Sequence, residues 1–270
     1  KEALELQKVH EKSGKYFCLT HTYTGYPMVK EARQQALSGK LGKIRKVYVE
    51  YPQGWLSDFV DNSGNKQAAW RTDPGKSGIA GCMGDIGTHA FNLAEYVSAL
   101  QVTQLCADIN TVVEGRRLDD DGAVLLKFNN GASGVLMASQ IAAGEENNIK
   151  IRVYGEKGSL EWMQAAANSL ILKWQDRPAE ILRTGAGYLS SYAAHNTRTP
   201  PGHPEGYLEA FANLYRNFAL CIDAGGHGHT PLPEWLDFPG MEEGVRGMTF
   251  IEKVIESGNS AGKWLDFNAS

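Results

Sequence analysis

A glycine-rich run from Trp70 to His89 holds the residue types that suit proton transfer. It reads WRTDPGKSGIAGCMGDIGTH, with a glycine at every third position from Gly78 to Gly87. Asp85 and His89 lie four residues apart, a spacing that places both side chains on one face of a helix. A histidine titrates near neutral pH, so His89 suits a general base. The same spacing fits a structural interpretation, in which Asp85 caps the helix and His89 is a partly buried histidine.

The helix expected from about Asp85 to Leu100 can bury one side while its other side borders a cleft. The stripe that begins with Asp85 and His89 continues through Asn92 and Tyr96, beside an apolar stripe. Because glycine has no Cβ, the preceding glycines would let the backbone approach a ligand closely. The alternative is that these glycines only make turns.

Hydrophobic patterning predicts an α+β fold with a large, mostly antiparallel open sheet and helices on one face. Turns such as NNG and GEKG separate candidate strands and indicate hairpins. Besides the helix that begins near Asp85, long helices are expected over Pro204–Asp223 and Met241–Ser257. The strands are expected at Ile44–Glu50, Val102–Val112, Gly122–Phe128, Ser133–Ile141, Ile149–Tyr154, Ser159–Trp162, Leu170–Trp174 and Glu180–Leu182.

The first residues have the pattern of the end of an α/β unit. Lys1–Lys12 has helical spacing and stops near Gly14, and Tyr16–Thr20 is a candidate buried strand. A loop over His21–Pro27 then leads into a helix from about Met28 to Ser38. The α+β sheet is therefore expected to follow an α-β piece of another architecture.

The bulk composition limits the classes of partner. The chain has 270 residues, 42% of them hydrophobic, and a formal net charge of -4 with no long run of one sign. Neither nucleic acid nor a membrane surface is expected as a partner, and no apolar stretch approaches the roughly eighteen residues of a membrane span. The four cysteines form no CxxC pair, so we expect reduced core thiols, which favours the cytoplasm. A small neutral ligand remains the expected partner.

Several segments resemble the Gfo/Idh/MocA oxidoreductases. The run WR followed by GxxGxxGDxGxH resembles the second signature of that family. GHPEGYLEAFANLYRNF (Gly202–Phe218) and RVYGEKGSLEW (Arg152–Trp162) resemble its later segments. KEALELQKVHEKSGKYFCLTHTYTGYP is similar to the stretch after the family's Glu-Lys-Pro motif, and GMEEGVRGMTFIEKVIESGNSAGKWLDF to its closing helix and strand. The resemblance therefore covers nearly the whole chain.

This resemblance implies an NAD- or NADP-dependent dehydrogenase that oxidises a secondary hydroxyl of a sugar, inositol or related polyol by hydride transfer. It implies that His89 and Asp85 are the acid/base pair. Loss of a hydride from the carbinol carbon leaves a protonated carbonyl, so His89 must remove the hydroxyl proton in concert. Asp85 would orient the substrate hydroxyl or the imidazole. The lysine of Glu-Lys-Pro, which polarises the reacting oxygen in the family, has no counterpart in this sequence.

The main dinucleotide-binding segment is also expected to lie outside this chain. A Rossmann fold needs GxGxxG between its first strand and helix, and the nearest run, GAGYLS at Gly185, lacks the third glycine. We therefore predict that residues 1–27 are a remnant of the dinucleotide-binding (Rossmann) domain. Residues 28–270 would form the α+β substrate-binding, catalytic and oligomerisation domain, and the chain alone is expected to be inactive.

Three residues are expected at the nicotinamide end of the pocket by resemblance: Tyr23, Trp70 and Arg71. The structural alternatives are a core aromatic for Trp70 and a surface ion pair for Arg71. The HGH run formed by His227 and His229 has no third ligand nearby, so no metal site is expected.

Sugars favour aromatic faces and convergent hydrogen-bonding groups, which makes His21, Trp55, His203 and Tyr207 the candidate substrate-binding residues. His203 follows two prolines and precedes Pro204 at a loop-to-helix junction, although it can equally cap the helix or face solvent. The many strands and few covering helices predict a homodimer or homotetramer formed through the sheet. Two other functions remain open: a non-catalytic sugar-binding or dimerisation module, and a glycosidase or epimerase that uses transient oxidation.

Overall fold

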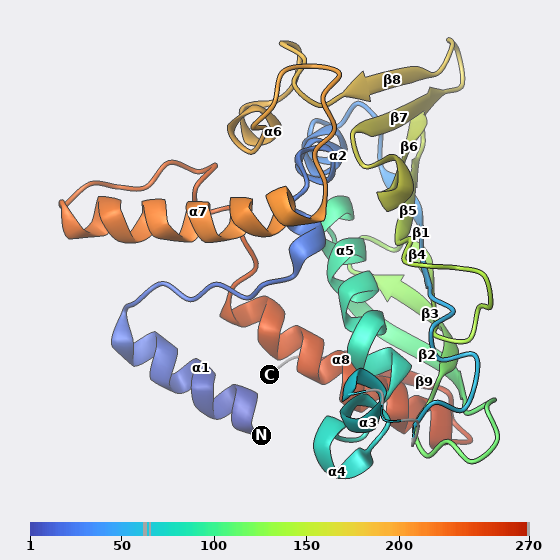
Figure 1. Cartoon of the computed structure of the whole chain (residues 1–270). Coiled ribbons are helices and arrows are strands. Elements are labelled where there is room, and N and C mark those ends of the chain that lie inside the picture. The colour runs from blue at the N-terminus through green and yellow to red at the C-terminus, as the bar shows by residue number, and fades with distance from the viewer. Residues whose placement is uncertain (62–63, 65, 269–270) are drawn as a thin grey trace.

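One large sheet forms the frame of the molecule, and its helices cover one face (Figure 1). The computed structural model describes residues 1–61, 64 and 66–268. Among these residues the strand order is β8-β7-β6-β5-β1-β4-β3-β2-β9. The strands are β1 Ile44–Pro52, β2 Val102–Asn110, β3 Asp121–Phe128, β4 Ser133–Ser139, β5 Lys150–Gly155, β6 Gly158–Met163, β7 Ser169–Trp174, β8 Glu180–Arg183 and β9 Trp264–Asp266.

The sheet has one parallel ladder at its centre, between β1 and β4, and antiparallel pairs elsewhere. In that ladder Lys46 pairs with Ser133 and Pro52 with Ser139, so both strands end at the same edge. Alternate residues of β3 and β4 are fully buried under the helices, as the period of two predicts. Leu125 and Met137 point to the open face of the sheet and are exposed. The expected α+β fold with a mostly antiparallel open sheet is confirmed.

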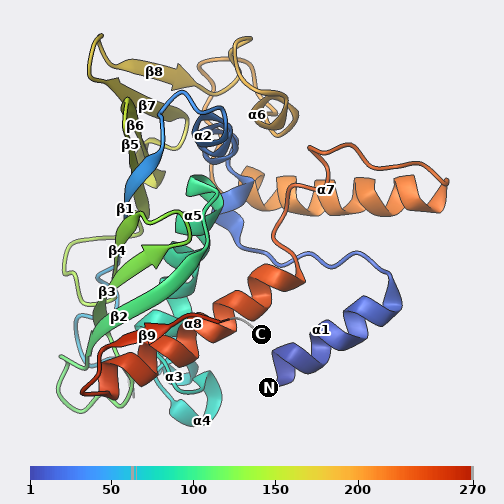
Figure 2. The same ribbon diagram turned by 180° about the vertical axis from the view of Figure 1, so that it is seen from behind.

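The helices lie on the other face, as the view from behind also shows (Figure 2). Pro27 begins α2, where its fixed φ suits a first helical turn. In the described part of the chain, no helix is long and apolar enough to cross a membrane. The helical elements are α1 Glu2–Ser13, η1 Thr22–Gly25, α2 Pro27–Leu37, α3 Lys66–Arg71, α4 Pro74–Ser77, η2 Met83–Gly87, α5 Thr88–Ser98, η3 Gln164–Ala166, α6 Ser191–His195, α7 Tyr207–Gly226 and α8 Met241–Asn259.

The expected strand over Tyr16–Thr20 is wrong. This segment has no ladder, and the bond from Leu19 N to Pro239 O, 2.7 Å long, joins its backbone to the segment before α8. An apolar run becomes a strand only when another strand lies alongside it, which patterning within the run does not reveal. The closing strand that the resemblance implied is β9, whereas the short helix α6 was not predicted.

Within the region before residue 28, the first helix is exposed whereas the last residues are buried in the main core. Helix α1 packs beside α8 yet buries none of its residues, and it ends at Gly14 in the left-handed conformation. By contrast, Tyr23 and Tyr26 are buried in the same core as the strands of the sheet. Gly25 lies so close to α7 that a Cβ there would be 2.1 Å from the carbonyl oxygen of Ala210. The 3₁₀ turn η1 is therefore built into the main core.

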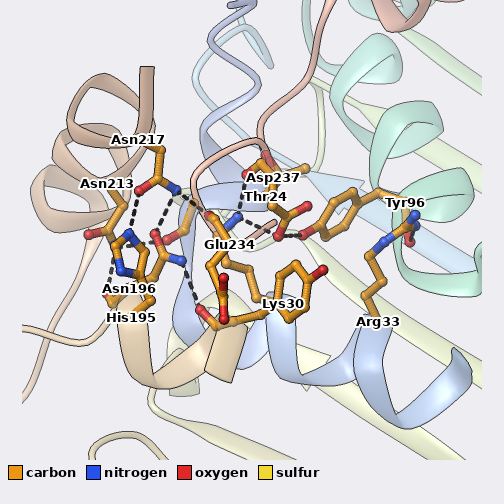
Figure 3. A network of polar contacts seen from close by, with 12 residues as sticks. Thr24, Lys30, Arg33, Tyr96, His195, Asn196, Asn213, Asn217, Glu234 and Asp237 are labelled. Carbon is orange, nitrogen blue, oxygen red and sulfur yellow. Dashed lines mark hydrogen bonds and ion pairs between the residues drawn. The ribbon is translucent and has the colours of Figure 1, made fainter. Parts of the chain in front are cut away.

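A buried polar network fixes α2 and α5 to the segment between α7 and α8 (Figure 3). The Lys30 side chain is completely buried and its ammonium donates to the Asp237 carboxylate at 2.8 Å and to the Asp237 carbonyl at 2.6 Å. The Tyr96 hydroxyl donates to the same carboxylate at 2.7 Å. Arg33 lies over the Tyr96 ring, 4.8 Å from its centroid. Two helices and the segment between α7 and α8 are thus held together around one carboxylate.

We predict that Lys30→Met lowers the free energy of unfolding by about 3 kcal/mol, because it leaves the Asp237 charge buried without its cation. Urea denaturation monitored by circular dichroism measures the loss. The exposed Lys40 is the matched control, and Lys40→Met should change the value by no more than about 0.5 kcal/mol. A decrease below about 1 kcal/mol in Lys30→Met would contradict the importance of this ion pair.

Candidate active site

A cavity of about 810 Å³ opens where the central strands end and η1, α5 and α7 come together. Its wall contains charged, carboxamide and aromatic side chains in close alternation. The parallel pair β1 and β4 sends the chain to this edge, with Gln53 and Gln140 directly after the two strands. A cavity of this size and mixed polarity suits a small hydroxylated ligand.

Asp85 and His89 both lie on the wall of this cavity. Asp85 belongs to η2, a π-helical turn in which the Thr88 N–H donates to the Met83 carbonyl five residues earlier. His89 follows in the first turn of α5. Single π turns within helices often accompany functional sites, because they redirect the side chains at the turn. The predicted placement of both side chains on one face is seen here across the π turn.

One of the glycines before Asp85, Gly81, serves packing within the chain rather than approach of a ligand. A Cβ on Gly81 would lie 2.3 Å from the carbonyl oxygen of Asp119. The Asp119 carboxylate accepts hydrogen bonds from the N–H groups of Gly81 at 2.6 Å and Met83 at 2.7 Å. Asp119 therefore fixes the entry to the π turn, and the interpretation that these glycines touch a ligand is wrong for Gly81.

The Asp85 carboxylate is held from two sides. Arg71 Nε of α3 donates to Asp85 Oδ2 at 3.1 Å, and Gln140 Nε2 donates to the same oxygen at 2.8 Å. Arg71 and Asp85 are both about three-quarters buried. The ion pair keeps the carboxylate oriented at the cavity wall. Burial lowers the pKa of His89, and the negative charge of Asp85 partly offsets this effect.

His89 is paired with a second histidine. His21 Nδ1 and His89 Nδ1 are 3.1 Å apart, and the two rings meet edge to face at 88°. Burial and the neighbouring His89 lower the pKa of His21 to about 3. Burial also lowers the pKa of His89, partly offset by Asp85. Both imidazoles are therefore neutral at physiological pH, as a proton acceptor requires.

A chain of phenols and carboxamides forms another part of the wall, beside His89. The hydroxyls of Tyr23 and Tyr51 are in hydrogen-bond contact, and Tyr51 donates to Asn147 Oδ1 at 2.8 Å. Gln53 donates to the same oxygen at 2.5 Å, while Asn147 Nδ2 donates to Gln164 Oε1 at 2.8 Å. Burial raises the pKa of both tyrosines, so both remain neutral hydrogen-bonding groups. The wall is pre-organised because each member fixes the next.

Most of the residues expected from the sequence meet at this cavity. His21 contacts His89, Tyr23 belongs to the phenol chain, Arg71 holds Asp85, and the Trp55 indole donates to Gln53 Oε1 at 3.0 Å. Tyr207, in the first turn of α7, also lines the cavity and is half exposed. The sequence-derived residues that line the cavity are His21, Tyr23, Trp55, Arg71, Asp85, His89 and Tyr207.

His203 and Trp70 are placed elsewhere. His203 is exposed beside a separate small cavity of about 90 Å³, and its Nδ1 is 3.2 Å from the Pro200 carbonyl. Glu205 turns this loop by accepting hydrogen bonds from the backbone N–H groups of residues 198 and 199. Trp70 is exposed and carries the Arg71 guanidinium 4.4 Å from its ring centroid. Successive helical residues point about 100° apart, so Trp70 cannot share the cavity face of Arg71.

Sequence reasoning missed the carboxamide residues of the cavity wall and also Gln140, which contacts Asp85. Gln53 and Gln140 each follow a strand, and a parallel pairing of those strands would have predicted that they meet. The sequence instead indicated a mostly antiparallel sheet and gave no pairing for these two strands. Asn147 and Gln164 flank β5 and β6, and nothing in the sequence distinguished them from ordinary loop and turn residues.

Comparison with known proteins places this architecture in one family. Residues 29–161 match the GFO/IDH/MocA C-terminal domain. The oxidoreductase YfiI of Bacillus subtilis is 30% identical over 268 residues, which are 98% of this chain and 68% of that protein. The levoglucosan dehydrogenase of Pseudarthrobacter phenanthrenivorans is 25% identical over 90% of this chain and 65% of that protein.

Solved structures of oxidoreductases have a similar fold. An inositol dehydrogenase homologue of Azotobacter vinelandii, complexed with NAD+, is 33% identical with a TM-score of 0.92, covering 98% of this chain and 69% of that chain. The complex of that homologue with NADH and myo-inositol gives 31% identity and a TM-score of 0.86, covering 98% and 68%. An oxidoreductase of Sinorhizobium meliloti is 40% identical with a TM-score of 0.83, covering 97% and 68%.

The fold and these relatives define an oxidoreductase. The chain belongs to the Gfo/Idh/MocA family.

The lowered pKa values of the histidine pair predict a stability that depends on pH. In the unfolded chain His21 gains a proton as the pH falls below about 6.5, whereas the folded state resists protonation down to about pH 3. Its contribution is therefore complete above pH 6.5 and is lost as the pH falls. Between pH 7 and pH 5 the wild type should lose about 2 kcal/mol more than His21→Asn in urea unfolding.

Trp55→Phe, which changes the cavity but retains both histidines, should keep the wild-type dependence on pH. Equal losses in the wild type and His21→Asn would show that His21 is already protonated in the folded protein near pH 6.

Proposed function

We propose that this chain provides the catalytic base and the substrate cavity of an NAD- or NADP-dependent dehydrogenase that oxidises a secondary hydroxyl of a sugar, inositol or related polyol. The observation that carries the proposal is the position of His89, a neutral imidazole on the wall of an open polar cavity, one turn from a carboxylate fixed by Arg71. A neutral imidazole in this position can accept a proton from a hydroxyl of a bound ligand.

The chemistry of the wall supports a polyhydroxylated substrate. Phenol hydroxyls and carboxamides both donate and accept, as does each hydroxyl of a polyol. Trp55 and Tyr207 add aromatic faces, which suit the C–H surfaces of sugar rings. The Azotobacter vinelandii homologue bound to NADH and myo-inositol supports the same substrate class.

The donor set of the cavity fits the reacting end of the dinucleotide rather than its pyrophosphate. Among the described residues that line the cavity, Arg71 is the one permanently charged cation, and its Nε is already used by Asp85. A pyrophosphate calls for free cations, whereas a nicotinamide ring needs a mostly apolar wall with a few polar partners. Tyr23 and Arg71 are the proposed contacts on that side. When bound, the oxidised nicotinamide accepts the hydride.

The proton is handled by residues of this chain. His89 removes the hydroxyl proton as the carbinol carbon loses its hydride, so that a ketone and a protonated imidazole result. The Asp85 charge stabilises this imidazolium and helps to orient the substrate hydroxyl. The ketone departs and His89 returns its proton to solvent. Each turnover therefore releases one proton and reduces one dinucleotide.

We predict that His89→Ala in the complete enzyme lowers kcat by roughly two to four powers of ten, because the concerted proton acceptor is lost. Affinity for NAD or NADP, measured by calorimetry, should change little. The exposed His229 is the control histidine, and His229→Ala should keep wild-type turnover. An unchanged kcat in His89→Ala would exclude the base and favour a non-catalytic binding module. Weak dinucleotide binding by residues 1–270 alone, and the assignment of residues 1–27 to a dinucleotide-binding domain, stay predictions.

We further propose that the chain forms a homodimer or homotetramer through the open face of the sheet. This face carries exposed apolar side chains beside ion pairs, with Leu125 on β3 and Met137 on β4 about half exposed. On the next strands Tyr48 and Tyr154 meet edge to face, and Arg152 pairs with Glu50 at 3.2 Å. Exposed apolar side chains grouped on one face can mark an interface between proteins.

Light scattering should show a dimer or tetramer for the wild type. The double variant Leu125→Glu, Met137→Glu is expected to yield a monomer, because it would place four or more buried charges across a symmetric interface. Ile222, equally exposed but on α7, is the control, and Ile222→Glu should keep the wild-type mass. A wild type that remains monomeric at high concentration would contradict the proposal.

A further inference from the structure

We infer that His21 is a positioning residue that fixes the tautomer of His89, so that His89 presents a bare Nε2 to the cavity. The consequence for turnover rests on the dehydrogenase proposed above, whereas the tautomer itself does not. The observation is the direct contact of the two Nδ1 atoms, 3.1 Å apart, between rings on different elements. This role differs from the substrate contact that the sequence suggested for His21.

The contact requires one proton between the two nitrogens. Two bare Nδ1 atoms at 3.1 Å would repel each other, so one ring carries Nδ1–H and the other accepts it. If His21 donates, His89 carries its proton on Nε2 and cannot act as a base there. If His89 donates, its Nε2 is bare and its lone pair is free for a substrate hydroxyl. Only the second arrangement is compatible with catalysis.

Protonation of His89 at Nε2 is compatible only with the second arrangement. When His89 accepts a proton at Nε2, both of its nitrogens carry hydrogen, and the contact survives only if His21 accepts. Asp85 favours the charged form of His89, whereas the nearby His89 disfavours the charged form of His21. The added proton therefore resides on His89, and His21 remains the neutral acceptor. The hydrogen bond becomes charge-assisted at that moment, which strengthens it as the proton is transferred.

The surroundings hold His21 in this position. Its carbonyl accepts hydrogen bonds from the Thr24 N–H at 3.1 Å and the Thr24 hydroxyl at 2.9 Å, as the first turn of η1 begins. The His21 N–H donates to the Leu19 carbonyl at 3.0 Å. On the other side, the Tyr23 ring packs edge to face against His89 with centroids 5.4 Å apart. His89 is thus confined between His21 and Tyr23, which limits rotation of its ring.

Nitrogen NMR on the complete protein, labelled with ¹⁵N-histidine and held at pH 8, reports the tautomer directly. In the wild type His89 should show a protonated Nδ1 and a bare Nε2. His21→Phe removes the acceptor but retains a ring, and His89 should revert to the Nε2–H form that histidine prefers in water. His21→Asn places a carboxamide oxygen near the lost Nδ1, so it should restore Nδ1–H. His89→Ala identifies the His89 signals.

Turnover should follow the tautomer. We expect kcat to fall about a hundredfold in His21→Phe, with substrate KM and dinucleotide affinity changed less than about threefold, and to recover in His21→Asn to within about tenfold of the wild type. A substrate-binding role would instead raise KM in both variants.

The outcomes separate the two proposals. A wild-type His89 protonated on Nε2, or a tautomer that is the same in the wild type and His21→Phe, would overturn the role of His21 whatever the enzyme does. A tautomer that switches as expected supports that role. If kcat in His89→Ala is nevertheless unchanged, the proposed dehydrogenase fails while the positioning contact stands.

Discussion

The parallel pairing of β1 with β4, in a sheet that is otherwise antiparallel, is the constraint on which the site depends. It brings the ends of two distant strands to one edge, so that Gln53 lines the cavity and the buried Gln140 lies beside Asp85. Gln140 then fixes Asp85, and Gln53 extends the phenol and carboxamide wall. If these strands were antiparallel, the two amides would lie at opposite edges, and Asp85 would have Arg71 but not Gln140 as a hydrogen-bond donor.

Desolvation determines the chemistry at that edge. Burial keeps both imidazoles neutral, and the ion pair with Arg71 keeps the charge of Asp85 beside them. A proton that enters this environment is stabilised at His89, because the negative charge of Asp85 acts on that ring. Acidity is thus set by position rather than by residue type, as in other sites where burial and a charged neighbour act in opposite directions.

Much of the fold was accessible from the sequence because each strand alternates and each long helix has an apolar stripe. The same patterns could not show that β1 and β4 are parallel or that Tyr16–Thr20 has no strand beside it, since pairing partners are set by tertiary structure. The Asp85 and His89 spacing was enough to predict two residues that line the cavity. The sequence could not show that His203 and Trp70 lie outside the cavity. The direction of His203 depends on a loop that Glu205 turns, and the direction of Trp70 depends on the orientation of α3.

The ends of the sheet have their own consequence. Its outermost strands, β8 and β9, have 4 and 3 residues, the shortest of the described strands. Short borders offer few unpaired backbone groups for another chain to extend in a continuous ladder. The open face of the sheet can therefore expose apolar side chains while the short edge strands resist fibre-like growth. This separates ordered self-assembly from aggregation.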